Sequence, residues 1–464
     1  MRISGTLLVA AVCLAAPLHA QTTYNPIVVK AMAGRWVRAQ CAAKGDFRSA
    51  SAATYLAYTD TAKDEDRKQS LMKSAVRVTT EAIKAGFPTP GSWYYLGRAD
   101  LMLGDVVGAD TAMTKAATLA PDCDQELKGF RQIAWNALVL PTAELLSHKS
   151  YDSAVVDLRA ANTISREYPQ GFFNLAIAYV DLTQYDSAVT YFKLAQEKST
   201  KEARFASTGD DATMNLALLY QQKGDHKDAI TEFQKYIAVK PNDAAAKKSM
   251  ATSMRLSGDT AGANQVTAAL AASGDLSAGE LMQEGIDAYK AQKYAEAVDF
   301  FTKVLDKEPG SHDALFNIAN MYLALGNGPK LAEAAKACLA VSPLGQDDLK
   351  LLAQGYRMSA DTNNMLKVFG QLTSLTTAVT VTRMAPTATG ATLVGTATGS
   401  EGQDAKGNTI PPTPVTLVFE FLDTKGAVVA TQEAAVPALQ PSAKFDINVT
   451  ATGAGIVSWR YHVK

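Results

Sequence analysis

Residues 210–241, DDATMNLALLYQQKGDHKDAITEFQKYIAVKP, contain two apolar stripes separated by a glycine. In the first stripe, Leu216 and Tyr220 have the spacing of one face of a helix. Gly224 then interrupts the pattern, as glycine commonly does after the end of a helix. A second stripe follows, and Pro241 ends it. The stretch therefore predicts a hairpin of two helices.

The features of this hairpin recur at intervals of 34 residues. The series in this register are Leu216, Met250, Glu284, Ile318 and Leu352; Gly224, Gly258, Gln292, Gly326 and Ala360; Ala229, Ala263 and Ala297; Phe233, Thr267, Phe301, Ala335 and Phe369; and Pro241, Pro309 and Pro343. One hairpin cannot bury both of its faces, so neighbouring hairpins must stack into a solenoid. We expect Ala229 and Ala263 to be buried where two helices touch.

Four segments of the chain resemble the tetratricopeptide repeat family. The matching residues are Trp93, Leu96, Gly97, Ala109, Met113, Ala116 and Pro121; Phe172, Leu175, Ala176, Tyr179, Tyr185, Ala188, Phe192 and Ala195; Asn215, Leu216, Ala217, Tyr220, Gly224, Asp225, Ala229, Phe233 and Pro241; and Tyr294, Ala297, Phe301 and Pro309. The resemblance covers residues 90–375 and, more weakly, 26–60. It implies a mainly α fold, a TPR-type solenoid of helical hairpins, and it says little about the ligand.

The repeat register is interrupted twice, by insertions near residues 124–134 and 200–209. Pro141 lies within an otherwise helical stretch, Gln125–Ser147, and we expect it to kink that helix. Residues 64–86 have the pattern of one long amphipathic helix, whose packing partner the sequence does not indicate.

The composition changes near residue 376, where threonine, valine, glycine and proline replace the helix formers. Alternating runs typical of short strands follow. They are Val379–Arg383, Thr392–Ala397, Val415–Leu422, Val428–Gln432, Lys444–Val449 and Ile456–Val463. These runs predict a small all-β sandwich of immunoglobulin-like size. Phe419–Asp423, with the sequence FEFLD, resembles the F-x-L-Y-D-like strand of small envelope-associated domains, without its tyrosine.

The first 20 residues have the pattern of a cleaved signal peptide. Arg2 supplies the positive charge, Leu7–Leu14 form a short apolar run, and Ala20 precedes the expected cleavage site. We therefore expect a periplasmic or extracellular protein. The expected organisation is a signal peptide (1–20), N-terminal helices with a degenerate repeat (21–89), a tetratricopeptide-repeat solenoid (90–375) and a C-terminal β-sandwich (376–464).

Three cysteines remain after the expected cleavage, which is too few for a fold built on disulfides. Cys338 lies among apolar residues of an expected helix, which favours a buried thiol. Cys41 and Cys123 could pair in an oxidising compartment, but they lie more than one hairpin apart, and both possibilities stay open.

The net charge of −1 gives no basis for binding nucleic acid or an anionic membrane. No stretch after the leader is long and apolar enough for a transmembrane helix. No histidine has a cysteine or carboxylate at the sequence spacing of a metal site. We found no motif of a catalytic nucleophile or a phosphate-binding loop either. We therefore expect a protein that is not an enzyme, with no catalytic, cofactor-binding or metal-binding residues.

In tetratricopeptide repeats the first helix of each hairpin lines a concave groove. The resemblance therefore implies a partner-binding groove formed by Tyr94, Arg98, Phe173, Ile177, Met214, Leu218, Met282, Ile286, Tyr289, Phe316 and Asn320. These residues are mainly apolar and aromatic, so a helix or an extended apolar segment of a partner protein suits the groove. We expect Phe173 and Phe316 to contribute to partner binding more than to folding.

Two functions from different classes remain open. In the first, the protein is a scaffold of the bacterial cell envelope that holds a partner peptide or helix in the groove. In the alternative, it is a cell-wall or glycan-binding protein in which the β-sandwich makes the contact and the solenoid is a spacer. Sugar sites favour exposed aromatics, whereas most aromatics of the sandwich alternate like core residues. This pattern favours the first function.

The join between the two parts also has a sequence signature. The last helix before the strands carries more apolar residues than one buried stripe needs, namely Met365, Leu366, Val368, Phe369, Leu372 and Leu375. The end of a solenoid requires a polar outer face or a cover. We therefore expect the β-sandwich to dock on this helix and cover it. The alternative is a free domain on a short threonine linker, with the helix exposed or used for dimerisation.

Overall fold

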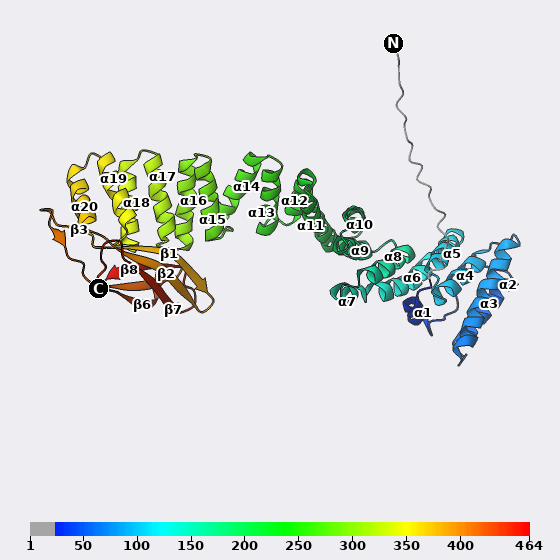
Figure 1. Ribbon diagram of the computed structural model, residues 1–464. Helices are drawn as coiled ribbons and strands as arrows, with labels where there is room; N and C mark the ends of the chain where they lie inside the picture. The colour runs from blue at the N-terminus through cyan, green and yellow to red at the C-terminus, as the bar shows by residue number, and fades with distance from the viewer. Residues whose placement is uncertain (1–23) are drawn as a thin grey trace, which may run out of the picture. The chain divides into compact units, whose positions relative to one another are not determined.

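The structure is a computed structural model that describes residues 24–464. The expected signal peptide lies outside the described residues. The described chain is mainly helical and ends in antiparallel β-sheets, as the sequence predicts (Figure 1). It divides into two compact units, one ending at Asn264 and the other running from Gln265 to Lys464. None of the described helices combines the length and the apolar character needed to cross a membrane.

Helices build the first unit. They are α1 (Pro26–Met32), α2 (Phe47–Thr59), α3 (Glu65–Lys84), α4 (Pro90–Met102), α5 (Val106–Leu119), α6 (Asp124–Val139), α7 (Thr142–Ser147), α8 (Tyr151–Ile164), α9 (Pro169–Asp181), α10 (Tyr185–Ser199), α11 (Ala206–Lys223), α12 (His226–Val239), α13 (Ala244–Leu256) and the start of α14 (Thr260–Ser273). The long helix expected at 64–86 is α3, and it packs against α2 and α4. Pro141 breaks the expected helix rather than kinking it, because α6 ends at Val139 and α7 begins at Thr142.

The backbone conformation repeats with the same period of 34 residues as the sequence. In each of five hairpins, a residue of the turn that follows the first helix has a positive φ, which glycine adopts without steric cost. These residues are Gly224 (82°), Gly258 (91°), Gln292 (60°), Gly326 (70°) and Ala360 (56°). Gln292 and Ala360 adopt the left-handed conformation despite their side chains, because the hairpin requires it at that position.

The alanine series and most of the phenylalanine series are buried in the solenoid. Ala229 and Ala263 are fully buried, which confirms the prediction made for them. Phe233 and Phe301 of the phenylalanine series are also buried. Phe369 is 56% exposed, because no further hairpin follows α20 (Thr362–Ser374) to cover it.

Replacing Ala229 by leucine should lower the free energy of unfolding by about 1–3 kcal/mol, because the larger side chain overpacks the contact between two helices. The matched control is Ala238→Leu, at an exposed position of the same helix. Thermal unfolding followed by circular dichroism should show a lower melting temperature for the first variant only. Equal melting temperatures for the two variants would mean that Ala229 does not lie at a tight helix contact.

The second unit contains the remaining hairpins and all the strands. Its further helices are α15 (Ala278–Lys290), α16 (Tyr294–Lys307), α17 (His312–Ala324), α18 (Gly328–Val341), α19 (Gln346–Met358) and α20. Its strands are β1 (Thr377–Thr387), β2 (Gly390–Gly399), β3 (Gly402–Gln403), β4 (Thr409–Ile410), β5 (Val415–Leu422), β6 (Val428–Val436), β7 (Lys444–Thr452) and β8 (Ser458–Val463). Each of the six alternating runs predicted from the sequence overlaps one of the longer strands.

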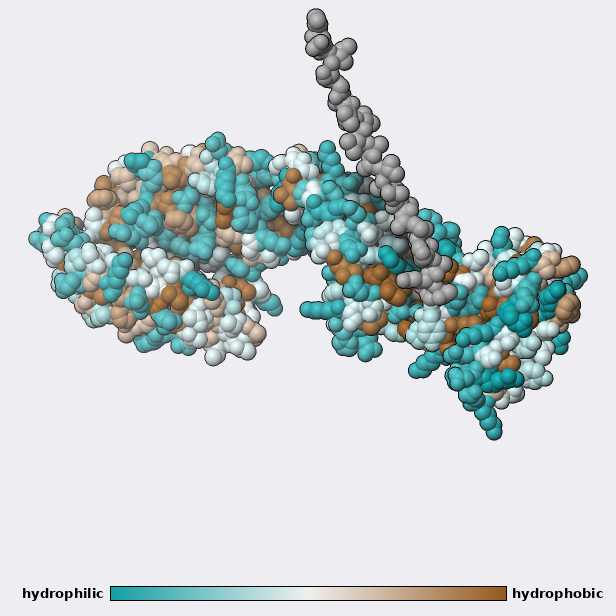
Figure 2. Space-filling model, turned by 45° about the vertical axis from the view of Figure 1, so that its right-hand side comes forward, coloured by the Kyte–Doolittle hydropathy of each residue, from teal (hydrophilic) through white to brown (hydrophobic). Residues whose placement is uncertain are grey.

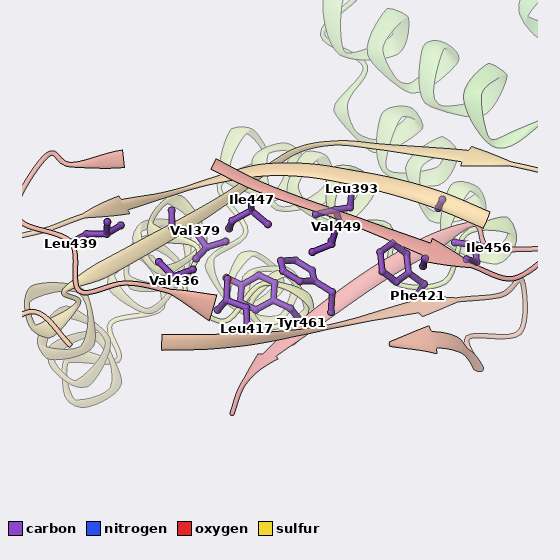
Figure 3. Packing of buried hydrophobic residues seen from close by; sticks show 14 residues of the cluster. Val379, Leu393, Leu417, Phe421, Val436, Leu439, Ile447, Val449, Ile456 and Tyr461 are labelled. Atoms are coloured by element: carbon purple, nitrogen blue, oxygen red, sulfur yellow. The ribbon is translucent and has the colours of Figure 1, made fainter. Parts of the chain in front are cut away.

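The strands form a β-sandwich with two antiparallel sheets. The strand order is β1-β2-β7 in one sheet and β6-β5-β8 in the other, and β3 pairs with β4 separately. Side chains from both sheets interdigitate in a common core (Figure 3). Leu393 and Ile447 come from the first sheet, and Leu417, Phe421 and Tyr461 come from the second. Successive side chains of a strand therefore point alternately into this core and toward the solvent, which explains the alternating pattern in the sequence.

The sandwich docks on the loops that connect successive hairpins of the second unit. The backbone N–H of Leu344, in the loop between α18 and α19, donates to the Tyr461 hydroxyl at 3.0 Å. The Ser342 hydroxyl donates to the same oxygen at 3.2 Å, and the N–H of Val379 donates to the Leu344 carbonyl at 3.1 Å. Ser458 donates to the carbonyl of Pro309, in the loop between α16 and α17. In Figure 1 the sandwich accordingly lies along one edge of the helical layer.

The docking position corrects the prediction for the last helix. The expected cover over α20 is absent for Leu366 and Phe369, which are 58% and 56% exposed. Val368 of α20 packs instead against α19 residues such as Leu352. Only Leu375 and Thr376 separate α20 from β1, and this short connection holds the sandwich at the helix ends rather than on the outer face.

Candidate functional site

Two of the expected groove residues, Tyr94 and Arg98 of α4, are fully buried. The Tyr94 hydroxyl donates a hydrogen bond to Glu126 Oε1 at 2.7 Å. The Arg98 guanidinium lies 3.4 Å from the centre of the Phe130 ring and donates to the Arg35 carbonyl at 3.1 Å. Burial raises the pKa of Tyr94 and lowers the pKa of Arg98. The prediction that these two residues line an open groove is wrong, because they belong to the core.

The segment that buries Arg98 is a strap formed by residues 33–46, which we call the N-terminal strap. A disulfide joins its Cys41 to Cys123, so the structure selects the paired state that the sequence left open. The backbone N–H groups of Gln40 and Ala42 donate to Glu126 at 3.1 Å and to Asp122 at 2.8 Å. These bonds and the disulfide hold the strap over residues that would otherwise face solvent.

The expected groove residues of α9 and α11 are more accessible. Phe173, Ile177 and Met214 are half-buried, and Leu218 is 39% exposed. The ring of Phe173 lies 5.7 Å from the ring of the buried Phe192 in the second helix of the same hairpin. Phe173 therefore contributes to hairpin packing as well as to the surface.

In the second unit, the expected groove residues lie on α15 and α17. Met282, Ile286 and Tyr289 follow one another along one face of α15, and Tyr289 is 49% exposed. Phe316 and Asn320 occupy on α17 the repeat positions that Met282 and Ile286 occupy on α15. Met282, Ile286, Phe316 and Asn320 are half-buried. The four hydrophobic residues of this set, Met282, Ile286, Tyr289 and Phe316, are called the apolar strip below.

The apolar strip is less buried than the core residues of the same helices. Asn320 Nδ2 donates to the Phe316 carbonyl at 2.8 Å, so this amide is engaged within its own helix. By contrast, Leu281 and Ala288 of α15 are buried between helices. On the face drawn in Figure 2, hydrophobic side chains form small groups among hydrophilic ones rather than one large patch.

Next to the apolar strip, three potential metal ligands converge where the sandwich meets the hairpins. They are His312 of α17, Cys338 of α18 and Asp348 of α19, and one ligand atom from each lies within 4.8 Å of the others. His312 Nε2 lies 2.9 Å from Asp348 Oδ2. Burial, with a further contribution from the carboxylate of Asp348, raises the pKa of the Cys338 thiol. Imidazole, thiolate and carboxylate together can hold a divalent transition metal.

The sequence did not reveal this cluster, because each of its residues lies on a different helix. Patterns within one helix or one loop carry the usual metal motifs, and no such spacing links these three positions. The repeat frame gives a signal for Asp348 alone, which falls in the series of Ala246, Glu280 and Ala314.

The aromatic side chains of the sandwich are engaged in its core or in its docking. Phe419, Phe421 and Tyr461 are buried. Trp459 is half-buried, and its ring stacks on His312 with 6.0 Å between the ring centres. Phe445 is also half-buried and packs against the core.

Solved structures that are similar to this chain share little of its sequence. A search of curated protein sequences found no match. Among solved structures, the apo form of RapI is 13% identical, with a TM-score of 0.33, and the match covers 70% of this chain and 96% of that one. The C-terminal part of a TPR repeat-containing protein from Cytophaga hutchinsonii is 15% identical, with a TM-score of 0.32, covering 50% of this chain and 93% of that one. YrrB, described as a TPR protein with an unusual peptide-binding site, is 17% identical, with a TM-score of 0.24 and coverages of 50% and 92%.

Sequence profiles of protein families match one segment in each unit. Residues 169–243, which contain α9 to α12, match the YpiA-like, C-terminal tetratricopeptide repeats. Residues 282–348, which contain α16 to α18 and parts of α15 and α19, match a tetratricopeptide repeat profile. These two segments are therefore similar to tetratricopeptide repeats in sequence, and the helices of the chain form a solenoid of the same hairpin type.

Proposed function

We propose that the protein is a non-enzymatic scaffold of the bacterial cell envelope, which holds a peptide or helix of a partner protein on its solenoid. The observation that carries the proposal is the apolar strip on α15 and α17. Its members lie on the first helices of successive hairpins, and they are only partly covered by the rest of the chain.

The spacing of the apolar strip suits a partner with one apolar face. Met282, Ile286 and Tyr289 form an i, i+4, i+7 row along α15, and Phe316 extends the row onto α17. An amphipathic helix or an extended segment with alternating apolar side chains could bury this row. Large aromatic side chains are the residues that most often anchor such contacts.

In the first unit the same repeat position is apolar on α11, whereas on α13 it is Lys248. Met214 of α11 is equivalent to Met282 and Phe316, and Leu218 is equivalent to Ile286. Leu218 is 39% exposed. Each unit by itself therefore offers apolar side chains on the first helix of a hairpin, which supports a binding role for these helices.

The glycan-binding alternative has less support. Carbohydrate sites in proteins commonly place an aromatic ring where a sugar can stack on it, and in the described sandwich no phenylalanine, tyrosine or tryptophan side chain is exposed. Trp459 is committed to its stack on His312. The sandwich is therefore a docked module of the solenoid. We propose that its resemblance to F-x-L-Y-D-like domains concerns the fold and not a glycan-binding function.

We propose that the protein is located in the periplasm or outside the cell. The signal-peptide pattern of residues 1–20 and the Cys41–Cys123 disulfide both support this location, because disulfides persist in oxidising compartments. The intact mass of the exported protein should correspond to a chain that begins at Gln21 and contains one disulfide. A mass that includes Met1, or a lipid adduct, would contradict the proposal.

Replacing Tyr289 by alanine should weaken partner binding by about 2 kcal/mol, on the order of thirtyfold in affinity, because an aromatic anchor is lost. The side chain is half exposed in the free protein, so the fold should keep its melting temperature. Binding is measured by quantitative mass spectrometry of proteins that copurify from envelope extracts, followed by titration of the purified partner.

The matched control is Leu325→Ala, which removes an apolar side chain of similar exposure, 46%, at the end of α17 and outside the apolar strip. This variant should retain the partner. Cosedimentation with purified cell wall tests the alternative function. Wall binding that both variants retain, together with no partner that distinguishes them, would favour the glycan-binding function over the proposed one.

A further inference from the structure

The cluster formed by His312, Cys338 and Asp348 is unusual for its positions in the repeat. Asp348 is the third residue of α19, and the third residues of α13 and α17 are the buried alanines Ala246 and Ala314. The third residue of α15 is Glu280, a half-buried carboxylate that caps its own helix. Asp348 is thus the member of this series that buries a charged group, at 2% exposure.

Cys338 and His312 also differ from the residues at the equivalent positions of other hairpins. Cys338 is the eleventh residue of α18, where α14 and α16 carry the buried Leu270 and Val304. His312 is the first residue of α17, and Ala278 is the first residue of α15. Three metal-ligating side chains therefore replace ordinary repeat residues at one junction, although each lies on a different helix.

The carboxylate of Asp348 is only partly satisfied by the protein. Its Oδ2 is bonded to His312, while its Oδ1 is buried and has no hydrogen-bond partner among the described residues. A buried carboxylate oxygen without a partner costs free energy that an alanine at this position would avoid. A cation bound beside the carboxylate would compensate this cost.

We propose that His312, Cys338 and Asp348 bind one zinc ion. An imidazole nitrogen, a thiolate and a carboxylate are all established zinc ligands, and the spread of these atoms allows small side-chain movements to bring them onto one ion. Magnesium and calcium prefer sites made of oxygen ligands only, so the buried thiol selects against them.

The charges balance in the zinc-bound state. The thiol of Cys338 loses its proton on binding, and the resulting thiolate and the Asp348 carboxylate together neutralise the two positive charges of the ion. The neutral imidazole of His312 supplies the third protein ligand. Three protein ligands leave the fourth position of a tetrahedral zinc ion for a water molecule.

The surroundings fix the orientation of His312 and give the ion a route in. The ring of His312 stacks with the rings of Phe316 and Trp459, with 6.0 Å between ring centres in each pair. Its side chain is 22% exposed, so this edge of the cluster is open to solvent. Zinc at this place would tie α17, α18 and α19 together beneath β8, the strand that carries Trp459.

The test uses the untagged mature chain, freed of metal with a chelator and titrated with zinc chloride by isothermal calorimetry. We expect one zinc ion per chain and a higher melting temperature with zinc. Cys338→Ser and Asp348→Asn should each weaken zinc binding by about 100-fold or more, since loss of an outer-shell partner alone costs 10–100-fold. Cobalt chloride should give a thiolate-to-cobalt absorption band that Cys338→Ser abolishes.

Two controls remove similar side chains outside the cluster. Asp313→Asn neutralises the exposed neighbour of His312, and His148→Ala removes an exposed histidine of the first unit. Both should bind zinc like the parent chain, and magnesium chloride should give no heat of binding. Zinc affinity that is unchanged in both Cys338→Ser and Asp348→Asn would overturn the proposal, as would the absence of zinc binding by the parent chain.

The variant Asp348→Ala guards against misfolding as an explanation, because it restores the alanine that the repeat carries in α17. In the presence of chelator it should be at least as stable as the parent chain, and its melting temperature should no longer respond to zinc. A response to zinc equal to that of the parent would place the ion elsewhere and refute the assignment.

Discussion

Replacing both Cys41 and Cys123 by serine should lower the free energy of unfolding of the first unit by about 4 kcal/mol. The bridge spans 82 residues, and a cross-link over a loop of this length removes much of the conformational entropy of the unfolded chain. The strap also covers Arg98, which is fully buried in the native state. Its release would expose that guanidinium and the Tyr94–Glu126 hydrogen bond to water.

Urea denaturation with and without a reductant measures this effect. The parent chain should lose stability on reduction, whereas the double serine variant should be insensitive to reductant. In denaturant without reductant, the mature parent chain should show the thiol of Cys338 alone. Equal unfolding midpoints of the oxidised parent and the double variant would mean that the bridge does not constrain the chain.

Replacing Asp100 by asparagine should stabilise the protein above neutral pH, by up to about 4 kcal/mol. Asp100 of α4 is 8% exposed, and burial, assisted by the charge of Asp105, raises its pKa from 3.8 to about 7. The folded chain therefore keeps the proton up to about pH 7, while the unfolded chain releases it near pH 3.8. The resulting stability is fully present below pH 3.8 and is lost as the pH rises through 7.

Melting temperatures measured between pH 4 and pH 8 test this prediction, since asparagine has no proton to lose over that range. The difference between Asp100→Asn and the parent should grow with pH and level off above pH 7. Asp152→Asn, which neutralises an exposed carboxylate of α8, should show no such trend. A difference between Asp100→Asn and the parent that is constant over the whole range would contradict a raised pKa of Asp100.

The repeat could be predicted from the sequence because its constraints are local and recur. A turn after each first helix needs a left-handed residue, and Gly224, Gly258 and Gly326 mark it. Close helix contacts need small residues, and Ala229 and Ala263 supply them. The strands could also be predicted from the sequence, since their side chains alternate between one shared core and solvent.

The N-terminal strap could not be predicted, because it depends on contacts between segments far apart in the chain. The family resemblance placed Tyr94 and Arg98 on an open face, as in a regular repeat. The strap, which precedes α2, closes this face through the Cys41–Cys123 bridge and the acceptors of α6. Nothing in the spacing of the two cysteines distinguished the paired from the free state.

The docking of the sandwich was predicted in part. The expectation of a docked module is met by the bonds of Tyr461 to Ser342 and Leu344. The choice of α20 as the docking face was wrong, because an excess of apolar residues does not say which neighbour will cover them. The two-residue connection before β1 was the stronger constraint, since it limits how far the sandwich can move from the end of α20.

The central claim, partner binding on the first helices of the solenoid, is tested most directly by site-specific photocrosslinking in living cells. p-Benzoylphenylalanine takes the place of Tyr289 in the apolar strip or, as the control, of Glu333, which is exposed on the second helix α18. The account predicts a discrete crosslinked protein from position 289 and none from position 333. Crosslinks of equal yield from both positions, or none from position 289, would contradict it.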